Sequence, residues 1–272
     1  MGKKEILSLA IAAGYLGALL PRIKKERTCL PVKYYAHRGL YNNSGSAPEN
    51  TMPAFERAVK AGYGIELDVQ LTKDEEVVVT HDFHLKRNCG IEGDVDQFTC
   101  EELQQLSVFH SKEHIPLLED VLKKIDGKVP LLVELKYKDG SRICEKTCEI
   151  LDQYQGTYAI ESFHPQVLIW YKKHRPGIKR GQLSMNYQKI QGWFRPQYLI
   201  MRGLLLNFLT RPDFIAYDCR SGYSLSLQLC RYFYHCPAYG WTVKSKGQLK
   251  KAGKYFDGFI FEGFRPDADF EH

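Results

Sequence analysis

The sequence predicts an α/β protein: a single TIM (β/α)8 barrel with a small insertion and an N-terminal hydrophobic helix. The chain has 272 residues, close to the roughly 250 that such a barrel typically needs. Strand-like runs alternate with helical patterns at 52–61, 117–125, 141–154, 165–175 and 246–252, and this alternation implies βαβ units and a parallel sheet. Polar, chemistry-bearing residues follow several of the strand-like runs, where parallel sheets gather their functional groups.

The first strand-like runs carry the most informative residues. The apolar run at 32–36 leads into His37-Arg38, and the run Val77-Val78-Val79 leads into His81-Asp82. Between them, the run at 64–71 contains Glu66 and Asp68, which point to one face because strand side chains alternate. The other face of that run is apolar. Three clusters of polar side chains are therefore expected at one end of the sheet.

The later strands follow in order along the chain. We expect strands at 133–135, ending at 162–163, near 179–182, near 213–217, at 240–243 and at 257–262. Nine strand-like runs are present where a barrel needs eight. The run at 77–80 follows the run at 66–71 across a turn too short for a crossover helix, so one run is expected to be a hairpin arm or an excursion.

The polar clusters combine two imidazoles, one guanidinium and several carboxylates. Imidazoles suit proton transfer near neutral pH, paired carboxylates suit a hard divalent cation, and arginine suits a phosphate group. Buried carboxylates also require a paired cation or a metal. This combination indicates cleavage of a phosphodiester.

These residues fall within a set of ordered motifs. The chain resembles the glycerophosphodiester phosphodiesterases, a TIM-barrel family, over roughly residues 33–262. The motifs that carry the resemblance are 36–39 (AHRG), 48–51 (PENT), 64–72 (GIELDVQLT), 79–82 (VTHD), 133–136 (VELK), 162–163 (SF) and 240–243 (GWTV). The chain departs from the family at the last strand, where Thr-Asp followed by Pro is common and this sequence has Phe261-Glu262-Gly263-Phe264.

The resemblance implies a role for each site residue. Glu66, Asp68 and Glu134 would hold a divalent metal cation, Mg²⁺ or Ca²⁺; as an alternative to its acid–base role below, His81 would be bound to the metal instead. His37 and His81 would be the general acid–base pair of a reaction that passes through a cyclic phosphate. Substrate and phosphate binding would fall to Arg38, Lys136, Glu49 and Trp241. For Trp241, a packing role at the top of the barrel is an equal alternative.

Residues 1–28 form an N-terminal hydrophobic and basic segment, and residues 29–272 form the catalytic domain. The fifteen apolar or small residues at 6–20 fall short of the ~20 that span a bilayer comfortably. The segment is therefore expected to be a short membrane anchor, an interfacial helix or a signal peptide. More positive charge follows the segment than precedes it, which favours a catalytic domain on the cytoplasmic side. Eight cysteines without a Cys-x-x-Cys pair agree with a reducing compartment.

Two further segments stand out within the domain. Residues 83–115 resemble the small insertion that family members carry beside the site. Residues 186–210 form an apolar and basic loop, in a stretch (162–212) that has nine Lys and Arg and no acidic residue. Basic residues among aromatics attract anionic lipid headgroups, although the same helix could simply cap the barrel. The small excess charge and the lack of a nucleic-acid motif argue against nucleic-acid binding.

The sequence therefore predicts a metal-dependent hydrolase of glycerophosphodiesters that produces glycerol 3-phosphate and an alcohol and is associated with a membrane. Two alternatives stay open. A lysophospholipase D would use the same chemistry on membrane lysophospholipids, with the 193–209 region receiving the acyl chain. An inactive, membrane-associated binding protein would keep the barrel without the chemistry.

Overall fold

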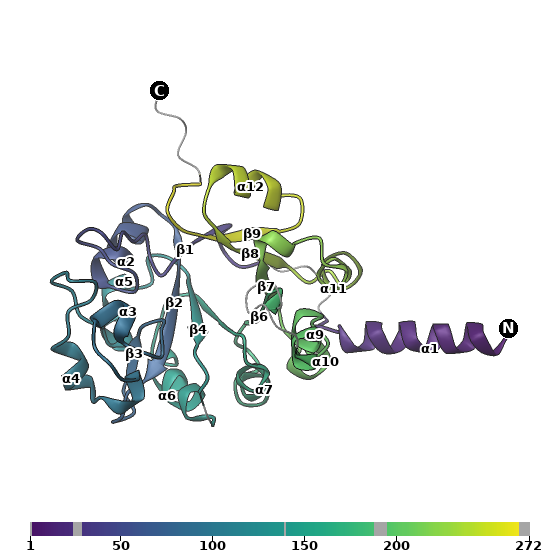
Figure 1. The fold of residues 1–272 in the computed structure, drawn as a ribbon, viewed down its shortest axis with the longest axis horizontal. Helices are drawn as coiled ribbons and strands as arrows, with labels where there is room; N and C mark the ends of the chain where they lie inside the picture. The colour runs from purple at the N-terminus through teal and green to yellow at the C-terminus, as the bar shows by residue number, and fades with distance from the viewer. Residues whose placement is uncertain (1, 24–28, 139, 188–194, 267–272) are drawn as a thin grey trace.

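The computed structural model describes the whole chain except residues 1, 24–28, 139, 188–194 and 267–272. Nine strands form one sheet in the order β1-β9-β8-β7-β6-β5-β4-β2-β3, and β1 also pairs with β2. The eight strands of this closed ring are all parallel, which confirms the predicted TIM barrel (Figure 1). They are β1 (Tyr34–His37), β2 (Gly64–Leu71), β4 (Leu131–Leu135), β5 (Tyr158–Ser162), β6 (Arg180–Ser184), β7 (Phe214–Asp218), β8 (Ala238–Val243) and β9 (Gly258–Phe261).

The ninth strand is a hairpin arm outside the ring. β3 (Val77–Val79) pairs antiparallel with the end of β2, with Val69 opposite Val79 and Leu71 opposite Val77. β3 is therefore the extra ninth run that the sequence contains, and it is a hairpin arm, one of the two expected alternatives. The turn between β2 and β3 reverses the chain and leaves no room for a crossover helix.

Helices surround the barrel between successive strands. All five helices predicted from the sequence are present, with ends that differ by no more than three residues: α2 (Met52–Lys60), α5 (Leu118–Ile125), α6 (Arg142–Leu151), α7 (Pro165–His174) and α12 (Lys246–Ala252). The other helical elements are α1 (Lys3–Ala18), α3 (Lys86–Cys89), η1 (Val95–Gln97), α4 (Cys100–Gln104), α9 (Pro196–Arg202), α10 (Asn207–Thr210), η2 (Cys219–Ser221), α11 (Leu225–Gln228) and η3 (Leu229–Phe233).

The strands bury both faces. Their outer faces pack against the helices in a large apolar layer that includes Ile65, Leu67 and Val69 of β2. Inside the barrel, a smaller cluster of aromatic and aliphatic side chains fills the end where the strands begin. Tyr239 packs edge-on against Tyr35 and Phe214 there, with ring centroids 6.3 and 5.7 Å apart. This plug leaves the opposite end, where the strands finish, for the polar residues.

Residues 83–115 follow the β2–β3 hairpin and contain α3, η1 and α4. This segment packs around an apolar cluster of its own, which includes Leu85, Val95 and Leu103 and joins β3 through Val78. Its small core holds it against the hairpin, and it therefore brings Arg87 of α3 to the edge of the site described below.

The N-terminal helix α1 projects from the barrel (Figure 1), and none of its residues is buried. Only its base is anchored: the Tyr15 and Ser226 hydroxyls are 2.8 Å apart, and the Tyr234 hydroxyl donates to the carbonyl of Leu16 over 2.7 Å. Among the helices described, none has the length and apolar character needed to cross a bilayer. The basic residues Lys24, Lys25 and Arg27 that follow α1 lie outside the described part of the chain.

Candidate active site

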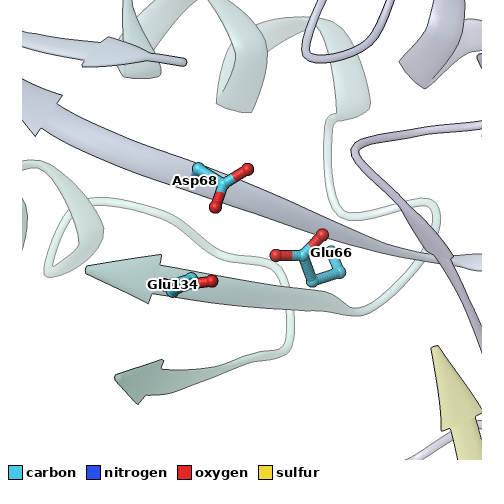
Figure 2. Close-up of side chains that lie close together, drawn as sticks. All are labelled: Glu66, Asp68 and Glu134. Atoms are coloured by element: carbon cyan, nitrogen blue, oxygen red, sulfur yellow. The ribbon is translucent and has the colours of Figure 1, made fainter. Parts of the chain in front are cut away.

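Three carboxylates from two neighbouring strands gather inside the open end of the barrel (Figure 2). Glu66 and Asp68 come from β2 and Glu134 comes from β4, where it stands opposite Asp68 in the parallel register. One oxygen from each carboxylate lies within 4.8 Å of the others, and all three residues are buried. The three residues share a face because strand side chains alternate and register partners point the same way.

A fourth carboxylate, Glu161, extends this cluster, and the sequence analysis missed it. Glu161 lies on β5 opposite Glu134 and is buried, and its Oε2 atom has no hydrogen-bond partner. The signal was available, since Glu161 directly precedes the Ser162-Phe163 motif on a predicted strand end. Its role becomes visible only when β4 and β5 are placed side by side.

Burial and mutual repulsion govern the protonation of these acids. Burial raises the pKa of Glu66 well above its usual value, and the charges of Asp68 and Glu134 add to this rise. Burial likewise raises the pKa of Glu134 and, more strongly, that of Glu161. For Asp68, burial acts in the same direction but is outweighed by Lys136, His81 and Arg38, so its pKa lies well below the usual range. The carboxylates of the cluster therefore outnumber the positive charges beside them, which disfavours ionisation of all four.

Two cations of the site contact this cluster directly. The Nζ atom of Lys136 is 3.1 Å from Asp68 and 2.8 Å from Glu134. Arg38 places Nε 3.5 Å from Asp68 and Nη1 2.6 Å from Glu49. The Asn50 amide also donates to Asp68 over 2.9 Å. Glu49 therefore binds the guanidinium of Arg38.

A tight turn after β1 aims Arg38 at the cluster. Arg38 and Gly39 have φ angles of 55° and 82°, in the left-handed region that disfavours side chains. At Gly39 a Cβ atom would lie 2.8 Å from the backbone of Ala54, so only glycine fits. The turn directs the Arg38 amide to donate to Glu66 over 3.0 Å. The His-Arg-Gly motif therefore supplies the residues that the tight turn needs as well as the functional side chains.

The first histidine is held by a residue that the sequence analysis did not choose. The Nδ1 atom of His37 is 2.6 Å from Glu262, and its Nε2 atom is 3.9 Å from Glu66. Glu262 follows β9, at the point where the chain departs from the family motif, and it also accepts a hydrogen bond from the Tyr41 hydroxyl. Burial lowers the pKa of His37, and the hydrogen bond to Glu262 partly opposes this effect.

The second histidine has an adjacent partner. His81 Nδ1 is 2.6 Å from Asp82, so Asp82 orients His81 and does not join the carboxylate trio. Arg87 from the 83–115 segment binds Asp82 and also Glu49, with Nη2 2.6 Å from Glu49 Oε1. A continuous set of ion pairs therefore joins His81 to Arg38.

These groups surround one cavity of about 530 Å³. One side is polar, with His37, Arg38, His81 and the carboxylates. The lining also includes the apolar side chains of Phe163, Leu183, Met185 and Trp241. Trp241 packs edge-on against Phe163, with ring centroids 5.4 Å apart, so it combines the wall and packing positions that the sequence left open.

All nine residues predicted for the site lie in this one region. Seven of them line the cavity, and the other two, Asp68 and Lys136, contact residues that do. Glu161, Glu262 and Arg87 also line the cavity and are not among the residues predicted from the sequence. Part of the predicted 186–210 loop, including Trp193 and Phe194, falls outside the described residues.

A parallel barrel that presents carboxylates, an arginine and two carboxylate-paired histidines at the ends of its strands is suited to phosphoric diester hydrolysis. A sequence model of the glycerophosphoryl diester phosphodiesterase family matches residues 37–190, more than half of the chain. The chain therefore belongs to this family of phosphoric diester hydrolases, which confirms the resemblance seen in its motifs.

Individual proteins are also similar to this chain in sequence. A glycerophosphodiester phosphodiesterase of Bacillus altitudinis is 37% identical over 167 residues, which cover 57% of this chain and 67% of the relative. A lysophospholipase D of Mus musculus is 34% identical over 151 residues, covering 51% of this chain and 46% of that enzyme. The matched regions thus span about two thirds of the bacterial relative and under half of the mouse one.

Solved structures share the fold. The glycerophosphodiester phosphodiesterase of Thermotoga maritima superimposes with a TM-score of 0.65 at 24% identity, covering 86% of this chain and 96% of that one. A phosphodiesterase of Oleispira antarctica, solved in complex with the product sn-glycerol-3-phosphate, gives a TM-score of 0.67 at 23% identity, covering 85% of this chain and 92% of that one. At this identity, the comparison supports the barrel architecture.

Proposed function

We propose that this protein hydrolyses glycerophosphodiesters to glycerol 3-phosphate and an alcohol, with a divalent cation in the site. The observation that carries the proposal is the buried carboxylate trio beside two histidines whose Nδ1 atoms each lie 2.6 Å from a carboxylate. Family membership supports the reaction, and the donor chemistry supports the cation.

The residues of the trio fit a hard divalent cation. Glu66, Asp68 and Glu134 offer only oxygen ligands, which favours Mg²⁺ or Ca²⁺ over zinc. Glu161 adds a buried oxygen that has no hydrogen-bond partner. Four carboxylates here face two cations, Arg38 and Lys136, and a divalent cation would relieve the remaining repulsion. When bound, such a cation neutralises phosphate charge and lowers the pKa of the attacking oxygen.

His37 and His81 act as the acid–base pair in this proposal. Each carboxylate partner keeps a proton on Nδ1, which leaves Nε2 for proton exchange with the substrate. The glycerol 2-hydroxyl attacks the neighbouring phosphorus and gives its proton to one histidine, and the other histidine protonates the departing alcohol oxygen. Water then opens the cyclic phosphate with the two proton transfers reversed. The internal nucleophile has the advantage of proximity.

Arg38 and Lys136 bind the phosphate oxygens in this arrangement. Arg38 offers a planar fork and Lys136 a point charge, and Glu49 limits the orientations open to Arg38. Trp241 forms the wall against which the carbon skeleton of the substrate packs. These roles divide the cavity into a charged side for the phosphate and an apolar side for the glycerol or alcohol.

The direct test is release of glycerol 3-phosphate from a panel of glycerophosphodiesters by the full chain with Mg²⁺, with Ca²⁺ and with chelator. We expect metal-dependent release that is abolished in His37→Ala and Glu66→Ala. A folded protein that binds metal and releases no product from any soluble diester would exclude the proposed substrate class.

A specific observation favours lysophospholipase D activity as the second candidate. Aromatic side chains lead from Trp241 through Phe163 and Tyr187 to Tyr198 of α9, with successive ring centroids 5.4, 6.5 and 5.4 Å apart. Phe163 and Trp241 also line the active-site cavity, so an acyl chain of the substrate would pack against this end of the aromatic row. Turnover of glycerophosphocholine compared with lysophosphatidylcholine in vesicles separates the two activities, since only the second enzyme would require the acylated substrate.

We also infer that the protein rests on a membrane surface through α1 and its neighbours. Of the fourteen large hydrophobic side chains described as exposed, thirteen belong to residues 6–23 or 199–233. These two regions meet where the base of α1 contacts α11 and the residue after η3. Apolar side chains interspersed with Arg202 and Arg211 suit an interface with anionic lipid. The cytoplasmic location of the catalytic domain stays a prediction.

Co-sedimentation with vesicles tests this surface. The full chain should bind phosphatidylglycerol-containing vesicles more strongly than pure phosphatidylcholine, and Leu7→Ser/Ile11→Ser should weaken binding without loss of hydrolysis. Equal binding by the variant and the parent protein would remove α1 from the interface.

A further inference from the structure

A second, larger cavity of about 870 Å³ adjoins the active-site cavity. The two cavities share Tyr41, Asn43, Lys244 and Glu262 in their walls. The second cavity continues outward between the turn after β1, the helix α2 and the ends of β8 and β9. His37 lies on the active-site side of this boundary and is bound to Glu262.

The walls of this outer cavity are positively charged. They contain Arg57, Lys60, Lys244 and Arg265, and among the described residues that line this cavity Glu262 is the only carboxylate. The charge of Glu262 is already engaged: Oε1 is 2.5 Å from Lys244, and Oε2 is 2.6 Å from His37 and 3.0 Å from the Tyr41 hydroxyl. Arg57, Lys60 and Arg265 therefore have no carboxylate partner in this cavity among residues 2–266 that the structure describes.

The geometry points to this cavity as a subsite for an anionic leaving alcohol, one that carries a phosphate or carboxylate beyond the scissile phosphate. The inference rests on the proposed hydrolysis. In a glycerophosphodiester only the alcohol varies in charge, because the glycerol end carries hydroxyl groups alone. Clustered cations next to a low-dielectric wall attract such an anion and repel cationic headgroups such as choline or ethanolamine.

Two substrates test this preference. In 1,3-bis(glycerophospho)glycerol the leaving alcohol carries a second phosphodiester anion, whereas in glycerophosphocholine it carries a quaternary ammonium. With the full chain and Mg²⁺, we expect a higher kcat/KM for the anionic substrate. Added KCl should raise the KM of the anionic substrate more than that of glycerophosphocholine, since salt screens exposed charges.

The discriminating variant is Arg57→Gln/Lys60→Gln on α2, where both side chains are exposed and belong to no part of the proposed catalytic machinery. It should raise the KM for 1,3-bis(glycerophospho)glycerol by about tenfold, from the loss of two nearby cations, and leave kcat and the kinetics with glycerophosphocholine unchanged. Lys112→Gln, an exposed lysine in the 83–115 segment, is the matched control and should change neither substrate.

The outcomes separate the inference from the proposed function. Hydrolysis of both substrates with equal KM, unaffected by the double variant, overturns the anionic subsite and leaves the hydrolase intact. An equal rise in KM for both substrates also overturns it, because the cavity would then not distinguish charge. If neither substrate is hydrolysed, the proposed function itself is overturned.

Discussion

His37 and His81 each bind a carboxylate with the same local geometry, but the two carboxylates lie at very different distances along the chain. Each imidazole has Nδ1 2.6 Å from a carboxylate oxygen. Asp82 is the next residue after His81, whereas Glu262 is 225 residues after His37. The His37 side chain is 14% exposed and that of His81 is 32% exposed. The His81–Asp82 pair therefore forms between adjacent residues, whereas the His37–Glu262 pair forms only once β1 and β9 are paired. A sequence motif can thus contain a histidine and lack the carboxylate that binds it.

The largest expected effect comes from removing each imidazole. His37→Ala and His81→Ala should each lower kcat by about 10²–10⁴-fold, the usual contribution of a positioned acid or base. Steady-state release of glycerol 3-phosphate measures this. His84→Ala, another histidine close to His81, is the control and should retain activity. Activity retained in either imidazole variant would show that the two histidines are not a pair.

Removing the carboxylate partners should have the next largest effect. Glu262→Gln and Asp82→Asn should each lower kcat by about 10–100-fold, because each histidine would lose the group that orients it. The hydrogen bond to Glu262 raises the pKa of His37 against the effect of burial. In Glu262→Gln the pKa of His37 should therefore fall, and the limb of the pH–rate profile due to His37 should move to lower pH.

A pH–rate profile with an unmoved limb would contradict the role of Glu262, even if kcat fell for structural reasons. The Asp82→Asn profile is the matched comparison. The His37–Glu262 pair should also be lost more readily when the end of β9 unfolds locally. The His81–Asp82 pair does not depend on β9.

Metal binding should change stability at the carboxylate trio. The raised pKa of Glu66 means that the metal-free protein loses stability as pH rises from the unfolded-state value, about 4.3, toward that raised value. At neutral pH, Mg²⁺ at about 100 times its Kd should add about 2.7 kcal/mol and raise Tm by roughly 5–10 °C. Thermal denaturation with and without chelator measures the shift.

Glu66→Gln should abolish the metal-dependent shift and raise the metal-free Tm at pH 7. Glu76→Gln, an exposed acid at the β2–β3 turn, should keep the wild-type response. A metal shift unchanged in Glu66→Gln would place the cation elsewhere.

We expect the smallest change in kcat from loss of the hydrogen bond between Tyr41 and Glu262. Tyr41→Phe removes a 3.0 Å hydrogen bond to Glu262 and leaves the contact with His37 in place. Lys244 and His37 still hold the carboxylate, so kcat should fall less than tenfold, which corresponds to less than about 1.4 kcal/mol. A fall as large as that of Glu262→Gln would make Tyr41 part of the proton-transfer machinery.

Much of the barrel was predictable because its signals are local. The alternation of apolar strands and helical patterns, and the short turn before β3, follow from nearest neighbours along the chain. The same holds for Glu66 and Asp68, which share a face because they are two residues apart on one strand. Glu161 was within reach of the same argument, since it stands opposite Glu134 once consecutive parallel strands are aligned. Membrane contact through α1 and residues 199–233 is a different case: composition suggested it, and a binding experiment has to decide it.

Patterns within a few residues of sequence predict the barrel, the short turn before β3 and the shared face of Glu66 and Asp68. The order of the family motifs adds Glu134 and His37-Arg38 to the site. The contact of Glu262 with His37, the contact of Arg87 with Glu49 and the basic cavity beside the site become visible only in the folded chain. Glu262 is 225 residues from His37, and Arg87 is 38 residues from Glu49. Folding brings such distant residues within hydrogen-bonding reach, and contacts across these separations leave no periodic trace in the sequence.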